Sequence, residues 1–350
     1  MNIARWFALG FVALVLVCAG GFIVVREEVP AARSGFMPRV CRSVQPRVLA
    51  RGPIGDLDLP VQRIIAHGSE TVLLAAHTWM VAIDGQVLGP FGNAQRGAPG
   101  YLADPQDAVI TDTAIFILDV AGHAIRVFSK TGSFERSVAL PRSSAVITQP
   151  RQLFVENNEI FITALRFGAV TPEWALLHLT GYPKQLEPLF AMPGSSINGI
   201  VVDYANGIAS IGEMSSYRIT TLRADTSQSK TVTRESVPLH PFSAKERRRY
   251  RSYWSQLPPG TRTAFDLPAY VPPLVHLKRI ARTGYAALVT QDVDNVHVEI
   301  LDNGGSPICR MTETAIERPV ALSDSGFYFI AEEAEELILK FAEYRYAADD

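Results

Sequence analysis

Titratable side chains crowd into the stretch DVAGHAIRVFSKTGSFERSV, residues 119–138. His123, Arg126 and Glu135 are of the types that carry out acid–base chemistry or bind charged ligands. The same stretch also fits ordinary strand and turn chemistry, with Gly132 in a turn. The seven histidines of the chain show no i, i+2 or i, i+4 pairing, so spacing predicts no histidine-based metal site.

Nucleophilic catalysis and nucleic-acid binding find no support in the sequence. No G-x-S-x-G elbow occurs, and the serines lie mainly in turn-like segments. The formal net charge of -2 provides no basic field that would hold DNA or RNA. Hydrophobic residues make up 47% of the 350 residues, which is enough for a large folded core.

Short apolar strands recur along the chain with a regular period. Each unit joins two apolar strands through an Asp, Asn or Gly turn and adds a third strand after a polar loop. The ends of the third strands fall at Ile83, Phe128, Leu179, Leu222, Leu301 and Phe341. Most gaps match one four-stranded propeller blade of about 40 to 50 residues. The long gap after Leu222 contains an interruption at residues 239–273.

This periodicity predicts an all-β fold, a six-bladed β-propeller over residues 44–347. The segment PQDAVITDTAIFILDVAGHAIRVFSKTGSFERSV, residues 105–138, resembles an NHL-type repeat, and RPVALSDSGFYFIAEEAEELILKF, residues 318–341, resembles it in part. Gly122 stands where the repeat pattern has Asn. The chain is thus similar to exported bacterial six-bladed propellers, most of which have no assigned function. The resemblance implies that His123 stabilises a loop.

Some six-bladed relatives of NHL-type proteins are enzymes, such as lactonases and amidating lyases. In them, side chains at the inner ends of several blades converge on a metal in the central channel. The corresponding candidates precede the first strands of their units: Asp107, Gln152, Asn198, and either Glu317 or Arg318. A basic member such as Arg318 would repel a divalent cation. We therefore expect no metal and no cofactor, with calcium or another divalent ion only if the chain is such an enzyme.

The interruption at residues 239–273 has its own character. Ser243 as N-cap and Glu246 three residues later predict a helix over residues 243–257. The helix carries basic and aromatic side chains, among them Arg247, Arg248, Arg249, Tyr250 and Trp254. Such a mixture could contact an anionic ligand, a protein or a membrane surface. It could equally pack its aromatics on the propeller and expose its arginines to solvent.

The N-terminal 25 residues contain an uncharged run over residues 6–25, long enough to cross a bilayer. Arg5 before this run predicts that the chain after it is translocated. The segment could be an uncleaved inner-membrane anchor or a cleaved signal peptide, and a lipoprotein site at Cys18 ranks third because Val17 is bulky. A linker follows at residues 26–43. The expected location is the periplasmic side of the membrane, or outside the cell after cleavage.

Two of the three cysteines, Cys41 and Cys309, lie after this segment. In an oxidising compartment they could form a disulfide that ties the linker to a late strand. They could also be two unrelated thiols, because the sequence does not give their separation.

The sequence favours a binding module for a protein or small-molecule ligand, without nucleic acid. The alternative is a divalent-metal-dependent hydrolase or lyase, lactonase-like, with its site in the central channel.

Overall fold

The structure is a computed structural model of the chain. It describes the following residues: 26–28, 39–40, 46–53, 61–67, 70–93, 95–141, 147–167, 172–180, 185–193, 199–223, 229–233, 240–256, 270–280, 284–290, 295–317, 320–333 and 336–344.

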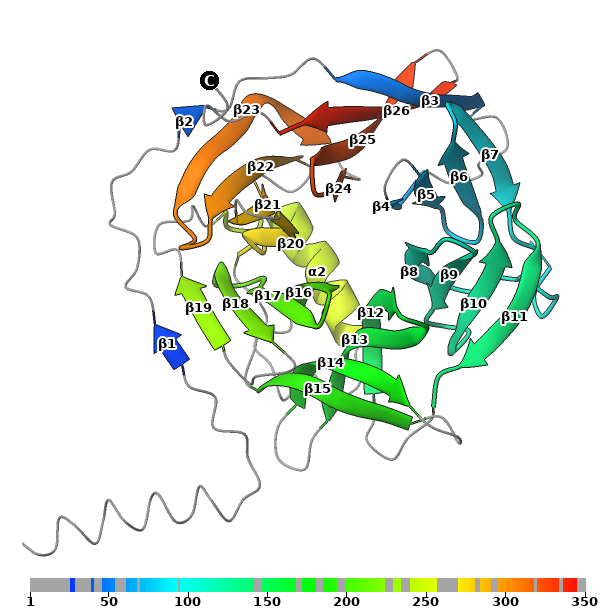
Figure 1. Ribbon diagram of the computed structural model, residues 1–350, viewed down its shortest axis with the longest axis horizontal. Coiled ribbons are helices and arrows are strands. Elements are labelled where there is room, and N and C mark those ends of the chain that lie inside the picture. Colours follow the sequence, from blue (N-terminus) through cyan, green and yellow to red (C-terminus); the bar gives the residue numbers. More distant parts are fainter. Residues whose placement is uncertain are drawn as a thin grey trace, which may run out of the picture.

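The strands form sheets arranged in a ring around a common centre (Figure 1). Within each group of consecutive strands the pairing is antiparallel, and each group begins with an innermost strand, followed by neighbours further out. One four-stranded sheet contains β8 (Pro105–Ile110), β9 (Ala114–Asp119), β10 (Ala124–Ser129) and β11 (Phe134–Ala139). The other contains β12 (Ile147–Glu156), β13 (Glu159–Phe167), β14 (Pro172–Thr180) and β15 (Gln185–Pro193).

Two further sheets gain a fifth strand from the N-terminal part of the chain. One contains β16 (Ile200–Ala205), β17 (Ile208–Glu213), β18 (Arg218–Arg223) and β19 (Ser229–Thr233), with β1 (Arg26–Glu28) parallel to β19. The other contains β20 (Leu274–Ile280), β21 (Gly284–Thr290), β22 (Asn295–Asp302) and β23 (Pro307–Glu317), with β2 (Arg39–Val40) parallel to β23.

An eight-stranded sheet completes the ring. It combines β4 (Arg63–His67), β5 (Glu70–Leu74), β6 (Trp79–Ile83) and β7 (Gln86–Phe91) with β24 (Val320–Leu322), β25 (Gly326–Glu333), β26 (Glu336–Glu343) and β3 (Arg47–Pro53). Strand β3 pairs with β26 over most of its length but with β7 through one residue pair, Arg51 and Gln86. In the part of the chain that the structure describes, the separate sheets therefore number five, where the sequence predicts six units.

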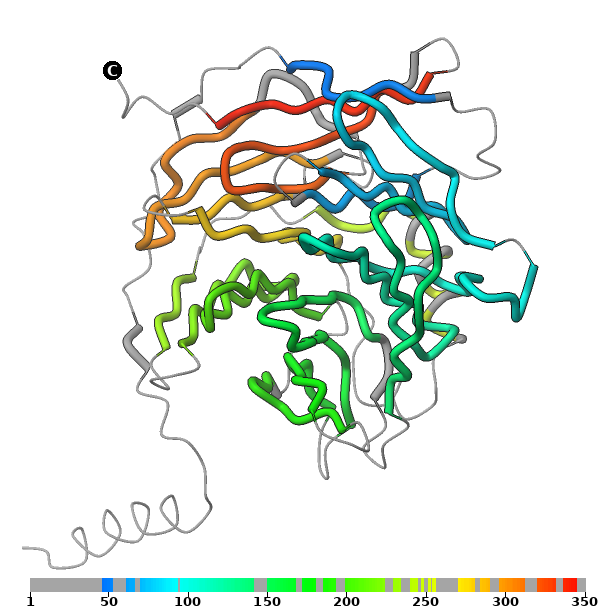
Figure 2. The backbone as a smooth tube through the Cα atoms, turned by 45° about the vertical axis from the view of Figure 1, so that its right-hand side comes forward, coloured from blue at the N-terminus to red at the C-terminus, as the bar shows by residue number. Residues whose placement is uncertain are grey.

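The N-terminal strand β3 closes the ring by joining the C-terminal strand β26. Figure 2 shows the two strands, blue and red, side by side. Leu339 of β26 lies opposite Ala50 of β3, and both are buried. Such a closure pairs the outer edge of the last strand, which would otherwise be open to other chains.

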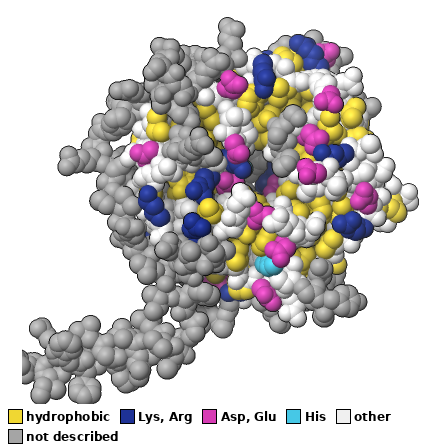
Figure 3. Space-filling view, in the orientation of Figure 1, with side chains coloured by type: hydrophobic (Ala, Val, Ile, Leu, Met, Phe, Trp, Pro, Cys, Tyr) yellow, Lys and Arg dark blue, Asp and Glu magenta, His cyan; other side chains and the backbone are white. Residues whose placement is uncertain are grey.

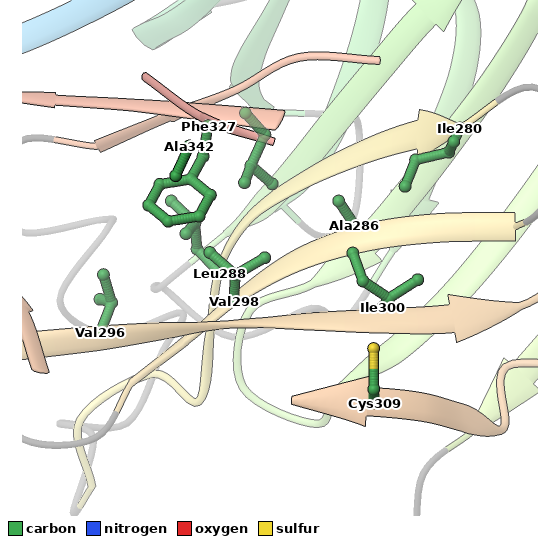
Figure 4. Close-up of a cluster of buried hydrophobic side chains, with 10 residues drawn as sticks. Ile280, Ala286, Leu288, Val296, Val298, Ile300, Cys309, Phe327 and Ala342 are labelled. Carbon is green, nitrogen blue, oxygen red and sulfur yellow. The ribbon is translucent and has the colours of Figure 1, made fainter. Parts of the chain in front are cut away.

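Hydrophobic cores fill the spaces between neighbouring groups of strands, and they recur all round the ring. Trp79 of β6 packs against Phe128 of β10. Two interfaces further round the ring, Trp174 of β14 packs with Ile200 of β16 and Ile211 of β17. Figure 4 shows the cluster between β20–β23 and β24–β26, with Ile300, Cys309 and Phe327. Strands buried on both faces explain the apolar runs that the sequence displays.

The stretch at residues 119–138 is structural turn chemistry. The fully buried Asp119 carboxylate accepts hydrogen bonds from the backbone N–H groups of Ala103 (3.0 Å) and Asp104 (2.8 Å), and Arg126 forms an ion pair with it (3.3 Å). His123 has a positive φ of 46° in the turn, and its side chain is exposed. A Cβ atom on Gly122 would lie 2.0 Å from the Asp119 carboxylate, which explains the glycine in place of Asn.

Helix α2 (Ala244–Gln256) confirms the helix predicted in the interruption. It lies on the far side of the ring in the view of Figure 1, behind β16 and β20. Among the described residues, no helix is both long and apolar enough to cross a membrane. The predicted segment at residues 6–25 lies outside them.

Candidate functional site

A cavity of about 600 Å³ occupies the centre of the ring. Residues from all the innermost strands, β4, β8, β12, β16, β20 and β24, line it, so we call it the central channel. Figure 3 shows a hollow at this position with acidic and basic side chains around it. Pockets of this size commonly hold small-molecule ligands.

Several polar side chains of the channel wall tie one innermost strand to the next. The Asp107 carboxylate on β8 accepts a hydrogen bond from the Leu153 N–H on β12 (2.8 Å). The Gln152 amide accepts from the Val202 N–H (2.8 Å) and donates to the Val202 carbonyl (2.9 Å). These bonds occupy the inward edges of strands that are too far apart for backbone pairing, so they are structural links.

A second group of charges in the channel is paired. Lys278 on β20 forms ion pairs with Asp203 (3.0 Å) and with Asp324 (3.5 Å). Asp203 also accepts a hydrogen bond from the Arg279 N–H (2.8 Å). Burial alone would lower the pKa of Lys278, but the two carboxylates outweigh it and the pKa is raised. The lysine therefore stays charged and engaged.

Arg63 on β4 also lines the channel, without a comparable partner. Its guanidinium forms no hydrogen bond or ion pair with the residues that the structure describes. Arg63 does lie near enough to Asp107 and His276 to act on the pKa of each. A guanidinium in a cavity with unused donors is suited to bind a carboxylate or another anion.

His276 on β20 faces the same cavity. Its Nδ1 is buried and has no hydrogen-bond partner in the described structure. Burial lowers the pKa of His276 to about 4, although Asp203 acts in the opposite direction. The ring is therefore neutral at physiological pH and offers hydrogen bonding rather than charge.

Asp107 has an unusual pKa for a carboxyl group. Burial raises the pKa of Asp107 from 3.8 to about 6, while Arg63 and the N–H groups of Leu153 and Ala108 lower it. Folding thus favours the protonated form of Asp107. The stabilisation of the folded state by this protonated carboxyl group is fully present below pH 3.8 and is lost as the pH rises through about 6.

Replacing Asp107 by asparagine should therefore stabilise the protein in neutral and alkaline solution. Asparagine keeps an oxygen that can accept the Leu153 N–H but carries no charge. We expect the free energy of unfolding at pH 8 to rise by about 2 to 3 kcal/mol, with a much smaller gain near pH 4. Urea unfolding at the two pH values measures the difference, and an equal effect at both would contradict the raised pKa.

Among the described residues, the donor set in the channel does not suit the divalent metal of the lactonase-like enzymes. The carboxylates of Asp107 and Asp203 are engaged by backbone N–H groups, and Arg63 and Lys278 place positive charge in the same space. No cluster of three metal-binding side chains occurs in the part of the chain that the structure describes. We derive no chemical step through a metal here.

The structure brings together some of the residues that the sequence singled out. Asp107 and Gln152 both line the channel, but they lie within β8 and β12 rather than before them. Asn198 and Arg318 lie outside the described residues. Sequence reasoning missed Arg63 and the pair of His276 and Lys278, because β4 and β20 show no motif that marks which of their polar residues line the channel.

The residues predicted on the basic helix are only partly described. Arg247 and Arg248 on α2 are exposed and Trp254 is half-buried, whereas the side chains of Arg249 and Tyr250 lie outside the described part. A contact between this helix and an anionic ligand, a protein or a membrane stays a prediction.

Cys309 on β23 is disulfide-bonded. Strand β2 places Arg39 opposite Cys309 and Val40 opposite Arg310, which brings the chain just before Cys41 alongside this cysteine. Cys41 itself lies outside the described residues, and its role as the partner stays a prediction.

Comparisons with known proteins show the fold and no family. No family model and no curated protein matches the chain. A solved structure of a DUF4221 family member from Bacteroides vulgatus is similar with a TM-score of 0.53 at 9% identity, over 87% of this chain and 99% of that one. A Bacteroides fragilis protein named as a candidate exported protein is similar with a TM-score of 0.53 at 10% identity, over 92% of this chain and 99% of that one.

A virginiamycin B lyase from Staphylococcus aureus has a TM-score of 0.48 at 12% identity, over 84% of this chain and 98% of that one. This likeness is too weak to use in an argument. The chain therefore has an all-β, propeller-like fold, and its function has to be argued from its own channel.

Proposed function

We propose that the protein is a binding module that takes a small polar ligand into its central channel. The observation that supports this most is the guanidinium of Arg63, which lines the channel and forms no hydrogen bond or ion pair with the described residues. Arg63 is half-buried, so its donors are available to a ligand that enters the channel. The cavity of about 600 Å³ has room for a small molecule beside this guanidinium.

We further propose that the eight-stranded sheet works as two blades, which gives the predicted six. The hydrophobic cores support this, since one core lies between β4–β6 and β25–β26 as between every other pair of neighbouring groups. An extracytoplasmic location is supported by the disulfide at Cys309, because such bonds persist mainly in oxidising compartments. We also propose that residues 6–25 form the membrane segment that the sequence predicts.

A channel-filling substitution tests the binding proposal. Val109 on β8 lines the channel and is half-buried, so tryptophan at this position should intrude into the cavity and narrow it. We expect Val109→Trp to abolish the thermal stabilisation that a bound small molecule gives. The matched control is Leu88→Trp on the outer strand β7, where the side chain is 40% exposed and points away from the channel.

The screen uses the full chain with a library of small polar molecules. A hit that stabilises the wild type and the Leu88→Trp variant but not the Val109→Trp variant supports the proposal. Hits that stabilise all three proteins equally would contradict it. Stoichiometric metal in elemental analysis together with turnover of a lactone would favour the lactonase-like alternative instead.

A further inference from the structure

We infer that the ligand of the central channel carries an organic ammonium group, which binds at one mouth of the channel against the rings of Phe154 and Tyr204 and beside the carboxylate of Glu156. This inference rests on the proposed binding function and names the class of ligand.

The first step is an aromatic wall at the ends of β12 and β16. Phe154 on β12 and Tyr204 on β16 both line the cavity, and both are half-buried. The centroid of the Tyr204 ring lies 6.1 Å from that of Phe154 and 4.6 Å from that of the buried Phe161, so packing fixes its position. The negative face of an aromatic ring attracts a positive charge. Part of the channel wall is therefore suited to a cation.

The second step is that carboxylates border this wall. Side chains two residues apart on a strand point to the same face of the sheet, so Glu156 lies on the same side of β12 as Phe154. Glu159 on β13 lies opposite Glu156, and Phe161 lies opposite Phe154. Strand β12 ends at Glu156, and the next two residues are exposed. The aromatic wall therefore has an acidic border at a mouth of the channel.

The third step is the unmet charge of Glu156, which also lines the cavity. Its carboxylate accepts hydrogen bonds from the N–H groups of Asn206 and Gly207, which directly follow β16. These bonds hold the carboxylate near the end of β16, where Tyr204 lies, but they bring no positive charge. Among the described residues, no cationic side chain forms an ion pair with Glu156. A bound ammonium group would supply that counter-charge.

The Tyr204 hydroxyl group adds an acceptor to the same place. It forms no hydrogen bond with the residues that the structure describes. Burial, together with the charges of Glu156 and Glu159, raises the pKa of Tyr204, so the phenol stays protonated. Its oxygen can accept a hydrogen bond from an ammonium N–H.

The charge balance of the whole channel favours the same class of ligand. The described charged side chains that line it are four carboxylates and two cations: Asp107, Glu156, Asp203, Asp324, Arg63 and Lys278. Lys278 is shared between Asp203 at 3.0 Å and Asp324 at 3.5 Å. Even when Asp107 is protonated, the remaining carboxylates outnumber the two cations. Such a cavity attracts cations and repels anions.

NMR titrations with two organic cations and their uncharged counterparts test the inference. The probes are choline and butylammonium, with dimethylbutanol and butanol as the matched neutral molecules. We expect the wild type to bind at least one of the cations about 10-fold more tightly than its neutral counterpart.

Substitutions in the site separate the contributions of the charge and of the ring. Glu156→Gln keeps an acceptor oxygen but loses the charge, and should weaken cation binding by about 5- to 30-fold. Tyr204→Leu should weaken it by about 3- to 30-fold, whereas Tyr204→Phe keeps the ring and should retain most of the binding of choline. The matched controls are the exposed Glu135→Gln on β11 and Tyr270→Leu, which should leave binding unchanged.

Thermal unfolding of each variant shows whether it is folded. If Glu156→Gln does not fold, the comparison of Tyr204→Leu with Tyr204→Phe decides, because the two variants differ in the aromatic ring.

Equal binding of cations and neutral molecules, or unchanged cation binding in folded Glu156→Gln or Tyr204→Leu variants, would overturn the inference and leave the channel function intact. Failure of both cations to bind would also overturn it. Failure of the whole small-molecule library to give a hit that Val109→Trp removes would instead overturn the proposed function.

Discussion

Replacement of Glu299 by alanine is expected to lower the free energy of unfolding by about 3 to 5 kcal/mol. Glu299 on β22 is fully buried, and its carboxylate accepts hydrogen bonds from Tyr217 (3.1 Å) and Arg310 (2.8 Å). His297 lies 3.2 Å from the same carboxylate. Loss of the Glu299 carboxylate removes the acceptor of the Tyr217 hydroxyl and the counter-charge of Arg310. Leaving such buried groups without this partner costs more free energy than the hydrogen bonds themselves contribute.

The network also joins two neighbouring sheets, since Tyr217 follows β17 and Glu299 belongs to β22. Urea unfolding of the variant measures the loss. The matched control is Glu135→Ala on the outer strand β11, where an exposed carboxylate lies 3.8 Å from Arg136. We expect the control to change stability by less than about 1 kcal/mol. Similar stability of both variants would show that the buried network contributes little.

The second large effect concerns the closure of the ring by the N-terminal strand. Ala50 on β3 is 3% exposed and packs with Leu337 and Leu339 of β26. Replacement of Ala50 by aspartate would force an unpaired charge into this core. We expect a loss of more than about 3 kcal/mol, together with exposure of the β26 edge and aggregation on heating.

Val48 provides the matched control for this prediction, because it belongs to the same strand but is 45% exposed. Val48→Asp introduces the same charge two residues away and should change the free energy of unfolding by less than about 1 kcal/mol. Equal tolerance of both substitutions would mean that β3 does not contribute to the closed ring.

Much of the architecture could be predicted from the sequence, since alternating apolar strands and a period of about 45 residues are local signals. The pairing of β3 with β26 could not be predicted, because it joins residues almost 300 positions apart and leaves no local pattern. The addition of β1 and β2 as parallel edge strands is equally remote from any sequence signal, and these residues were expected to form a linker.

The candidate site was harder to predict from the sequence than the architecture. Asp107 and Gln152 could be named from their places in the repeat, but their hydrogen bonds to the next innermost strand could not. Arg63 and His276 become candidates only when the ring brings β4 and β20 to one cavity. A strand contributes one or two side chains to such a channel, so the ligand-binding set is scattered over the whole chain.

A crystal structure of the protein with a small molecule that stabilises the wild type but not Val109→Trp would test the central claim most directly. We expect electron density for that molecule in the central channel, with one of its polar atoms within about 3 Å of the Arg63 guanidinium. A molecule bound elsewhere on the ring, or a channel that stays without ligand density at saturating concentration, would contradict the claim.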